Sequence, residues 1–270
     1  MTSSASRSSP SSTEARPARP AAIAAAIDAE LRRHRNPVRA PAEKAYLKSD
    51  LEFLGVGLPA MRIIIGGVKR QHGGLDRQGL VALVRTLWGQ PVFERRMMAV
   101  LLLEAFQPLL RPADIALLER LIRQSKTWAF VDELAIAITG PLVERAPELL
   151  RVLDRWAEDD DFWLRRSAML ALLRPLRRGV GDFRRFARYA DRMLEEKEFF
   201  IRKSIGWVLR ETGKPQPDMV YAWLLPRAAR ASGVTVREAV KYLSSAQRAA
   251  VVAAHQSAKR PGGASGRAPR

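Results

Sequence analysis

One short stretch of the 270-residue chain combines a carboxylate and an aromatic ring in a way that suits chemistry on a cation. Trp128 and Asp132 are four residues apart, which places both side chains on one face of a helix. A carboxylate stabilises a nearby positive charge, and the electron-rich face of an indole attracts a cation by about 0.5–2 kcal/mol. The pair therefore predicts a site that acts on a cationic group.

The net charge of the chain indicates a polyanionic partner. The sequence has 46 Lys and Arg against 28 Asp and Glu, a formal charge of +18. Residues 1–20 and 256–270 hold only part of this excess, so most of it belongs to the rest of the chain. A GC-rich coding sequence, which favours arginine codons, is the alternative explanation for a share of it.

Several classes of site and location are disfavoured by composition. The chain has no cysteine and three scattered histidines, so we expect no disulfide, no metal and no cofactor. No apolar run approaches the roughly 20 residues of a membrane span, and residues 1–20 lack the hydrophobic core of a secretory signal. We therefore expect a cytoplasmic protein that does not enter the membrane.

The elements that must position Asp132 are helices. Residues 1–20 and 256–270 are low-complexity tails rich in Ser, Ala, Pro, Gly and Arg, and we expect them to be disordered. Residues 21–255 form one domain of amphipathic helices, since no segment alternates like a strand. The predicted breaks between helices are Gly73-Gly74, Arg111-Pro112, Gly140-Pro141, Gly179–Gly181 and Gly213–Pro217.

Five of these helices begin with similar segments. The segments start at Phe93, Trp128, Trp163, Phe200 and Thr235, with spacings of 35, 35, 37 and 35 residues, and we call them the first to fifth copies. A period near 36 with two helices per unit is typical of an α-solenoid. We therefore predict an all-α solenoid that forms a curved superhelix with a concave basic groove.

Each copy has an apolar face and a second stripe. Counting the first residue as zero, offsets one, five, eight and nine are apolar in the third and fourth copies: Leu164, Ala168, Ala171 and Leu172, then Ile201, Ile205, Val208 and Leu209. Offset two is arginine in four copies: Arg95, Arg165, Arg202 and Arg237. Offsets zero, three, four and seven form the second stripe, with Trp128, Asp132, Trp163, Arg166, Phe200, Lys203 and Trp207.

The second stripe is a candidate binding surface. An exposed row of aromatic and charged side chains favours a ligand, although the aromatic residues at offset zero could instead pack inside their own repeat. Packing explains Asp132 least well. Its offset holds small or apolar residues in the other copies, namely Met97, Ser167, Ser204 and Ala239.

About residues 30–245 resemble the bacterial AlkD-type DNA-alkylation-repair glycosylases. The resemblance rests on NPVRAPAEKAYLKSDLEFLGVGLPAMR, SKTWAFVDELA, DFWLRRSAMLALL, KEFFIRKSIGWVLRE and VTVREAVKYL, in that order. It implies a HEAT-like repeat fold that excises N3- and N7-alkylated purines from duplex DNA. It also implies that Asp132 is the catalytic acid residue, that Trp128 and Trp207 line the cleft, and that Arg166 and Tyr46 contact DNA.

Two features depart from the family pattern. Thr127 stands where the family commonly has a tryptophan before the one that matches Trp128, and the run Ile63–Ile65 followed by Gly66-Gly67 is unusual. Neither departure removes a group with a predicted role in the reaction.

The chemistry of alkylated purines supports the same function. A purine alkylated at N3 or N7 is already cationic, so it leaves without protonation, while the sugar becomes oxocarbenium-like. Asp132 would stabilise that charge and orient water, and Arg166, Lys203, Trp163 and Tyr46 would bind DNA. We therefore predict a monomeric DNA glycosylase associated with the nucleoid. The alternatives are a non-catalytic binder of damaged or branched DNA and a protein-binding scaffold.

Overall fold

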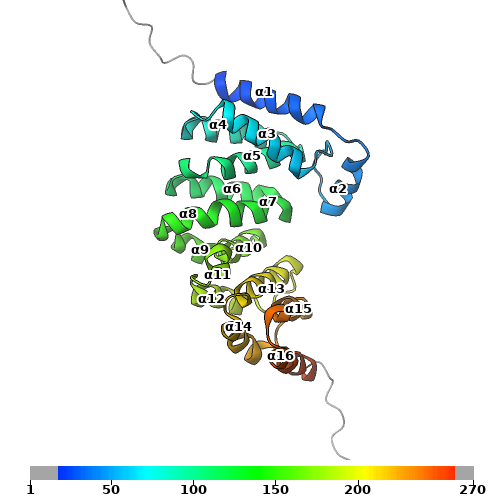
Figure 1. The fold of residues 1–270 in the computed structure, drawn as a ribbon, viewed down its shortest axis with the longest axis vertical. Helices are drawn as coiled ribbons and strands as arrows, with labels where there is room; N and C mark the ends of the chain where they lie inside the picture. The colour runs from blue at the N-terminus through cyan, green and yellow to red at the C-terminus, as the bar shows by residue number, and fades with distance from the viewer. Residues whose placement is uncertain (1–17, 259–270) are drawn as a thin grey trace, which may run out of the picture. The chain divides into compact units, whose positions relative to one another are not determined.

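The computed structural model describes residues 18–258 and divides into two compact units, one ending at Leu110 and one beginning at Arg111. Both units are built from helices, and the described residues contain no strand beyond an isolated bridge between Glu52 and Val92 (Figure 1). The predicted all-α class is confirmed. The predicted tails lie largely outside the described residues, although α1 already begins at Ala18 and the last helix continues to Ser257.

The described part of the first unit, residues 18–110, contains five α-helices and one 3-10 turn: α1 (Ala18–Arg33), α2 (Arg39–Leu47), α3 (Leu58–Gln71), α4 (Arg77–Trp88), α5 (Phe93–Ala105) and η1 (Gln107–Leu109). Fully buried leucines and isoleucines of α1, α4 and α5 form its core, including Ile27, Leu31, Leu83 and Leu102. The helix α4 begins where Asp76 accepts a hydrogen bond from the Gly79 N–H at 2.8 Å, as an N-cap should.

The second unit contains the remaining helices in repeated pairs. They are η2 (Pro112–Asp114), α6 (Ile115–Ser125), α7 (Trp128–Glu133), the π-helix η3 (Leu134–Thr139), α8 (Gly140–Arg145), η4 (Pro147–Leu149), α9 (Leu150–Trp156), α10 (Phe162–Leu170), α11 (Leu173–Arg177), α12 (Phe183–Met193), α13 (Phe199–Gly213), α14 (Pro217–Leu224), η5 (Leu225–Arg227), α15 (Gly233–Ala239), η6 (Val240–Tyr242) and α16 (Ser245–Ser257). The core offsets predicted for the third and fourth copies are confirmed, since all eight residues are buried.

The second copy has a different helix geometry. The predicted break at Gly140-Pro141 is wrong, because α7 continues through the π-helix into α8. Its buried residues come in pairs every four positions: Phe130-Val131, Leu134-Ala135, Ile138-Thr139 and Leu142-Val143. In a regular α-helix each four-residue step would turn a pair off the core by about 40°. The wider π-turn compensates for this drift and keeps every pair buried.

Asp132 differs in exposure from its counterparts in the other copies. Offset four is fully buried in the third and fourth copies, at Ser167 and Ser204, whereas Asp132 is partly exposed. The side chain at this offset therefore lies at a different depth in the second copy. Gly140 fixes this region against the next repeat, since a Cβ there would lie 2.8 Å from the Ala171 carbonyl oxygen.

Ion pairs link the first helices of successive repeats in the second unit. Each pair joins an arginine to an acid 34 to 36 residues away, one repeat along: Glu119–Arg155, Arg123–Asp159, Asp154–Arg188, Glu158–Arg192, Asp191–Arg227 and Glu195–Arg230. The more exposed of these pairs contribute at most about 1 kcal/mol each. Their larger consequence is that many arginines already have a partner, which leaves fewer of them for a polyanion.

Candidate active site

Asp132 and Arg166 form the centre of the candidate site. Arg166 Nε donates to Asp132 Oδ1 at 2.7 Å, and Arg166 Nη2 donates to Asp132 Oδ2 at 2.8 Å. This two-point contact joins α7 to α10 and holds both carboxylate oxygens in a fixed plane. The Arg166 side chain is 3% exposed and that of Asp132 is 16% exposed, so the carboxylate is the partner that solvent can reach.

The next repeat completes the surroundings of Arg166. Its Nη1 donates to the Phe200 carbonyl oxygen at 2.6 Å, and its guanidinium carbon lies 5.9 Å from the Phe200 ring centroid and 6.0 Å from that of Trp207. Both rings belong to α13 and are half-buried. Three successive repeats therefore supply Asp132, Arg166 and Trp207, as expected from the second stripe. Phe200 was on that stripe but was not predicted as a site residue, and its ring beside Arg166 could be found only from the structure.

Arg166, predicted to contact the DNA backbone, contacts groups of the protein itself in the structure. Its guanidinium is buried and uses Nε, Nη1 and Nη2 for contacts within the protein. A helical wheel gives the direction of a side chain and not its depth, so the burial of Arg166 could not be predicted, and its contact with DNA stays a prediction. The geometry instead gives Arg166 the task of holding Asp132.

Trp163, predicted as a DNA contact with packing inside its repeat as the alternative, is buried in the structure. It is 6% exposed, and its ring lies 4.4 Å from that of Phe162 and 5.0 Å from that of Phe200. The alternative of packing within the repeats therefore applies to this residue. The aromatic cluster supports the start of α10, where Arg166 is located.

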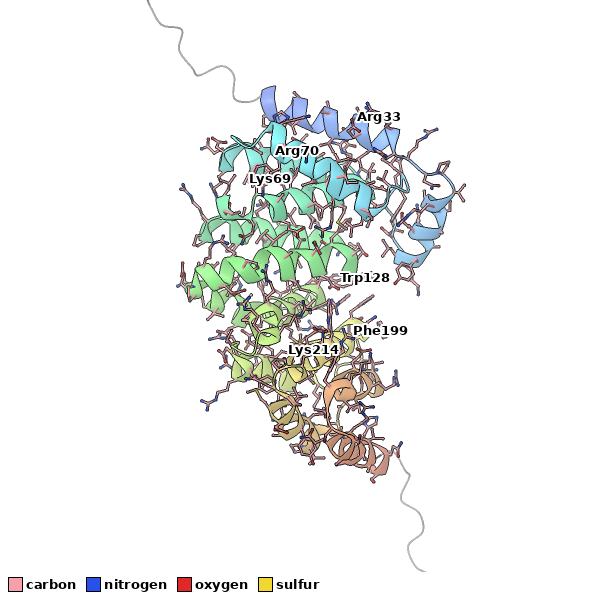
Figure 2. The ribbon with its side chains drawn as sticks, viewed as in Figure 1. Arg33, Lys69, Arg70, Trp128, Phe199 and Lys214 are labelled. Atoms are coloured by element: carbon pink, nitrogen blue, oxygen red, sulfur yellow. The ribbon has the colours of Figure 1, made fainter. Side chains whose placement is uncertain are left out.

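Trp128, Phe199 and Lys203 are the accessible side chains of this region. Trp128 is partly exposed at the first position of α7, and Figure 2 shows it on the same side of the second unit as Phe199. Phe199 is 50% exposed, and Lys203 Nζ lies 5.8 Å from its ring centroid. Lys203 is exposed, and its contact with phosphate stays a prediction.

Thr127 starts the helix that carries Asp132. Its side chain is 2% exposed and accepts a hydrogen bond from the Ala129 N–H at 3.4 Å, which makes it the N-cap of α7. The preceding residue, Lys126, has a left-handed backbone with φ of 51°. A threonine at this position thus serves the local fold, and the chain turns sharply just before Trp128.

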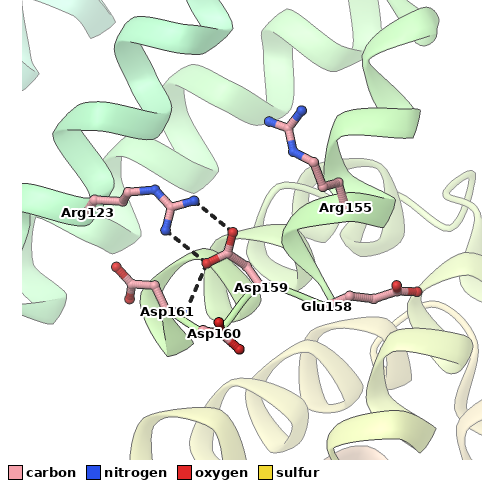
Figure 3. A pocket seen from close by; sticks show the side chains of 6 residues that line it. All are labelled: Arg123, Arg155, Glu158, Asp159, Asp160 and Asp161. Atoms are coloured by element: carbon pink, nitrogen blue, oxygen red, sulfur yellow. Dashed lines mark hydrogen bonds and ion pairs between the residues drawn. The ribbon is translucent and has the colours of Figure 1, made fainter.

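An acidic loop fixes the start of α10. The residues Glu158–Asp161, with Arg123 and Arg155, line a cavity of about 740 Å³ (Figure 3). Asp161 accepts from the Trp163 N–H at 2.9 Å, and Arg165 donates to the Asp159 carbonyl at 2.6 Å. These hydrogen bonds hold the loop against the first turn of α10, and the four acids disfavour phosphate in the cavity.

The Asp159 carboxylate makes this loop sensitive to acid. Arg123 contacts both of its oxygens, at 2.9 and 2.7 Å, and this hydrogen bonding lowers the pKa of Asp159 below its ordinary value. A carboxylate with a lowered pKa stabilises the fold above the unfolded-state pKa of about 3.9 and loses that contribution as the pH falls.

We therefore expect Asp159→Asn to lower the free energy of unfolding at pH 7 by about 1–3 kcal/mol. We also expect the difference between the variant and the wild type to shrink as the pH falls below about 4. Chemical denaturation followed by circular dichroism at several pH values measures both effects. A difference that is the same at pH 3 and pH 7 would show that the charge of Asp159 is not responsible.

Tyr46 lies in the first unit. It occupies α2 and is 73% exposed, as a DNA-contacting residue should be. Its contribution to the reaction remains a prediction.

The chain belongs to a known family. Residues 27–243 match the family of DNA alkylation repair enzymes. A comparison with curated proteins finds no match. No helix in the described part is both long and apolar enough to cross a bilayer, and residues 18–258 contain no cluster of three or more potential metal-binding His, Cys, Asp or Glu side chains.

Solved structures share the fold. A predicted DNA alkylation repair enzyme from Enterococcus faecalis is 21% identical, with a TM-score of 0.71 over 78% of this chain and 98% of that one. AlkD2 from Streptococcus mutans is 19% identical, with a TM-score of 0.55 over 76% of this chain and all of that one. The protein smu.31 from Streptococcus mutans UA159 is 18% identical, with a TM-score of 0.52 over 68% of this chain and all of that one.

Proposed function

We propose that the protein is a DNA glycosylase that hydrolyses the N-glycosidic bond of cationic N3- or N7-alkylated purines in duplex DNA. The observation that carries this proposal is the Asp132 carboxylate, held at two points by Arg166 yet partly open to solvent, in a member of a DNA alkylation repair family. We expect the enzyme to work as a monomer and to need neither a metal nor a cofactor.

The proposed reaction uses the charge already present on the lesion. The alkylated base leaves as a neutral purine when it takes the electrons of the glycosidic bond, and the deoxyribose carbon that it leaves becomes oxocarbenium-like. Asp132 stabilises that cation and orients the water that adds to it, while the water proton passes to solvent or to the carboxylate. Trp128 and Trp207 offer ring faces that attract the same positive charge.

Arg166 has an indirect part in this scheme. Its contact leaves each Asp132 oxygen with a further lone pair, so the carboxylate can still accept a hydrogen bond from water. The two-point contact also keeps the carboxylate in one orientation. Arg166 is therefore a positioning residue in the proposed mechanism.

DNA binding would depend on accessible cations and aromatic rings near the pair. Lys203 and Phe199 are exposed beside the aromatic cluster of α13, and contacts with phosphates set the register of DNA without reading its sequence. Lesion chemistry would then provide the selectivity.

The test is a base-release assay. Purified protein is incubated with methylated duplex DNA, and free 7-methylguanine and 3-methyladenine are measured by mass spectrometry. The same DNA incubated without protein at the same temperature gives the background of spontaneous release. We expect enzymatic release and matching abasic sites. Salt-dependent binding without release would instead support the non-catalytic DNA-binding alternative.

A further inference from the structure

The helices α1 and α3 of the first unit enclose a groove that the proposed reaction does not use (Figure 1). Its volume is about 290 Å³. Pockets for small molecules usually measure about 300–1,000 Å³, so this groove suits one or two apolar side chains better than a whole small molecule. Its apolar lining comes from both helices and includes Ile23, Ala26, Ile27, Ile63, Ile64 and Val68.

The surface around this groove is apolar where a soluble protein ordinarily has polar side chains. Ile63 is 73% exposed. Ala22, Ala26 and Ala29 are exposed and follow one face of α1, since they are four and three residues apart. The first helices of a solenoid usually have a polar outer face. The apolar face of α1 and α3 is therefore available to a partner.

Two adjacent glycines keep the α3 side of the groove open. Gly66 and Gly67 lie inside the helix, where glycine is less favourable than alanine. Neighbouring elements do not require glycine in the described part of the chain. A Cβ at Gly67 would meet no atom within 4 Å, and one at Gly66 would meet Arg70 Nη1 at 3.5 Å. The glycines leave the α3 backbone bare, so a side chain from outside can approach it closely.

Exposed cations follow the glycines along α3. Lys69 and Arg70 belong to its last turn, and Figure 2 labels both. Neither forms an ion pair with any residue between 18 and 258. Glu30, which also lines the groove, is already paired with Arg33 at 3.0 Å. Acidic side chains on a partner would therefore complement the charge of this surface.

We propose that the α1–α3 groove docks an acidic amphipathic helix of a partner protein. Apolar side chains on one face of that helix enter the groove over Gly66 and Gly67 and cover Ile63, while acidic side chains beside them pair with Lys69 and Arg70. The backbone of DNA has the charge to meet these cations but no apolar face to cover Ile63. The inference does not depend on the proposed glycosylase activity.

A designed peptide tests the surface directly. The peptide is helical and labelled with fluorescein, and it has leucines at positions i, i+3, i+4 and i+7 with glutamates beside them. One control has the same composition with its leucines spread around the helix, and a second has lysines in place of the glutamates. By fluorescence anisotropy with the full chain, we expect a dissociation constant on the order of 10–100 μM for the first peptide and at least about tenfold weaker binding of both controls. Equal binding of the three peptides, or no binding of the first below about 1 mM, would overturn the inference.

Two substitutions on α3 locate the binding site. We expect Ile63→Glu and Arg70→Glu each to weaken binding of the first peptide by at least about tenfold. Leu58→Glu makes the same apolar-to-acidic change at an exposed position at the start of α3. Arg85→Glu reverses a charge in the last turn of α4, as Arg70→Glu does in the last turn of α3. Both controls should bind within about twofold of the wild type, and equal losses in variants and controls would contradict the proposal.

Gly67 separates a binding role from a structural one. Gly67→Ala should raise the midpoint of thermal unfolding, because alanine favours a helix and its Cβ has space. Gly67→Leu should place a larger side chain over the groove and weaken peptide binding by at least about tenfold, without a lower midpoint than the wild type. A Gly67→Leu variant that folds and binds the peptide as the wild type does would show that the groove is not the docking site.

Two other occupants are distinguished by measurements on the same variants. Self-association in sedimentation velocity that Ile63→Glu abolishes would assign the groove to a second copy of the chain. Loss of duplex DNA binding in Ile63→Glu and Arg70→Glu, as large as the loss of peptide binding, would assign it to DNA. Either result would overturn the inference. We expect instead that both variants bind duplex DNA and release 7-methylguanine within about twofold of the wild type.

Discussion

Replacement of Asp132 by asparagine should reduce base release by about 10²–10³-fold, the loss seen when a group that stabilises transition-state charge is removed. The substitution keeps the size of the side chain and removes the negative charge that the oxocarbenium-like sugar requires. Single-turnover release of 7-methylguanine from a defined duplex measures the effect. Affinity for the same duplex should change little, because accessible cations and not Asp132 bind the phosphates.

Glu133→Gln is the matched control, since it removes a carboxylate from the next position along α7 and η3. The control should keep its rate within about twofold. If Asp132→Asn released the base as fast as the wild type, Asp132 would not be the catalytic residue and the proposed mechanism would be wrong.

Removal of Arg166 should damage both the fold and the reaction. Arg166→Ala leaves Asp132 without its partner in a largely buried setting, and such losses lower the free energy of unfolding by about 3–5 kcal/mol. Base release at saturating DNA should also fall, because the carboxylate loses its fixed orientation. Denaturant unfolding and single-turnover kinetics on the same samples check the two effects.

The double variant Asp132→Asn, Arg166→Ala distinguishes this account from a general packing role for Arg166. When the carboxylate charge is absent, loss of Arg166 leaves no unpaired charge, so the second substitution should cost less than it does alone. Arg184→Ala, at an exposed position of α12, controls for a simple change in net charge. Fully additive losses of stability would show that the two side chains do not act as a pair.

The repeat architecture could be predicted because its signals are local. The 35- to 37-residue spacing and the apolar offsets of the third and fourth copies follow directly from the periodicity of an α-helix. The helix of the second copy could not be predicted in the same way. Gly140-Pro141 is typical of a break between helices, but in the structure a π-helix precedes it and the chain stays helical through both residues.

A helical wheel predicts which side chains of the candidate site lie near one another, but not how deeply they are buried. The second stripe places Asp132, Arg166 and Trp207 near one another, and the structure shows the same. Arg166 pairs with Asp132, and its guanidinium carbon lies 6.0 Å from the Trp207 ring centroid. A helical wheel does not report depth, so it left the burial of Trp163 open and could not predict the burial of the Arg166 guanidinium. The hydrogen bonds that the buried Glu94 carboxylate accepts from the Leu54, Gly55 and Val56 N–H groups also could not be predicted, because they join residues 38 to 40 positions apart.

The most direct test of the central claim is base release from two duplexes that differ only in the charge of one purine. One duplex carries a single 7-methylguanine and the other carries the neutral purine hypoxanthine at the same position. The account predicts that the protein releases 7-methylguanine, leaves an abasic site, and does not release hypoxanthine. Binding of both duplexes without release of either base would contradict it.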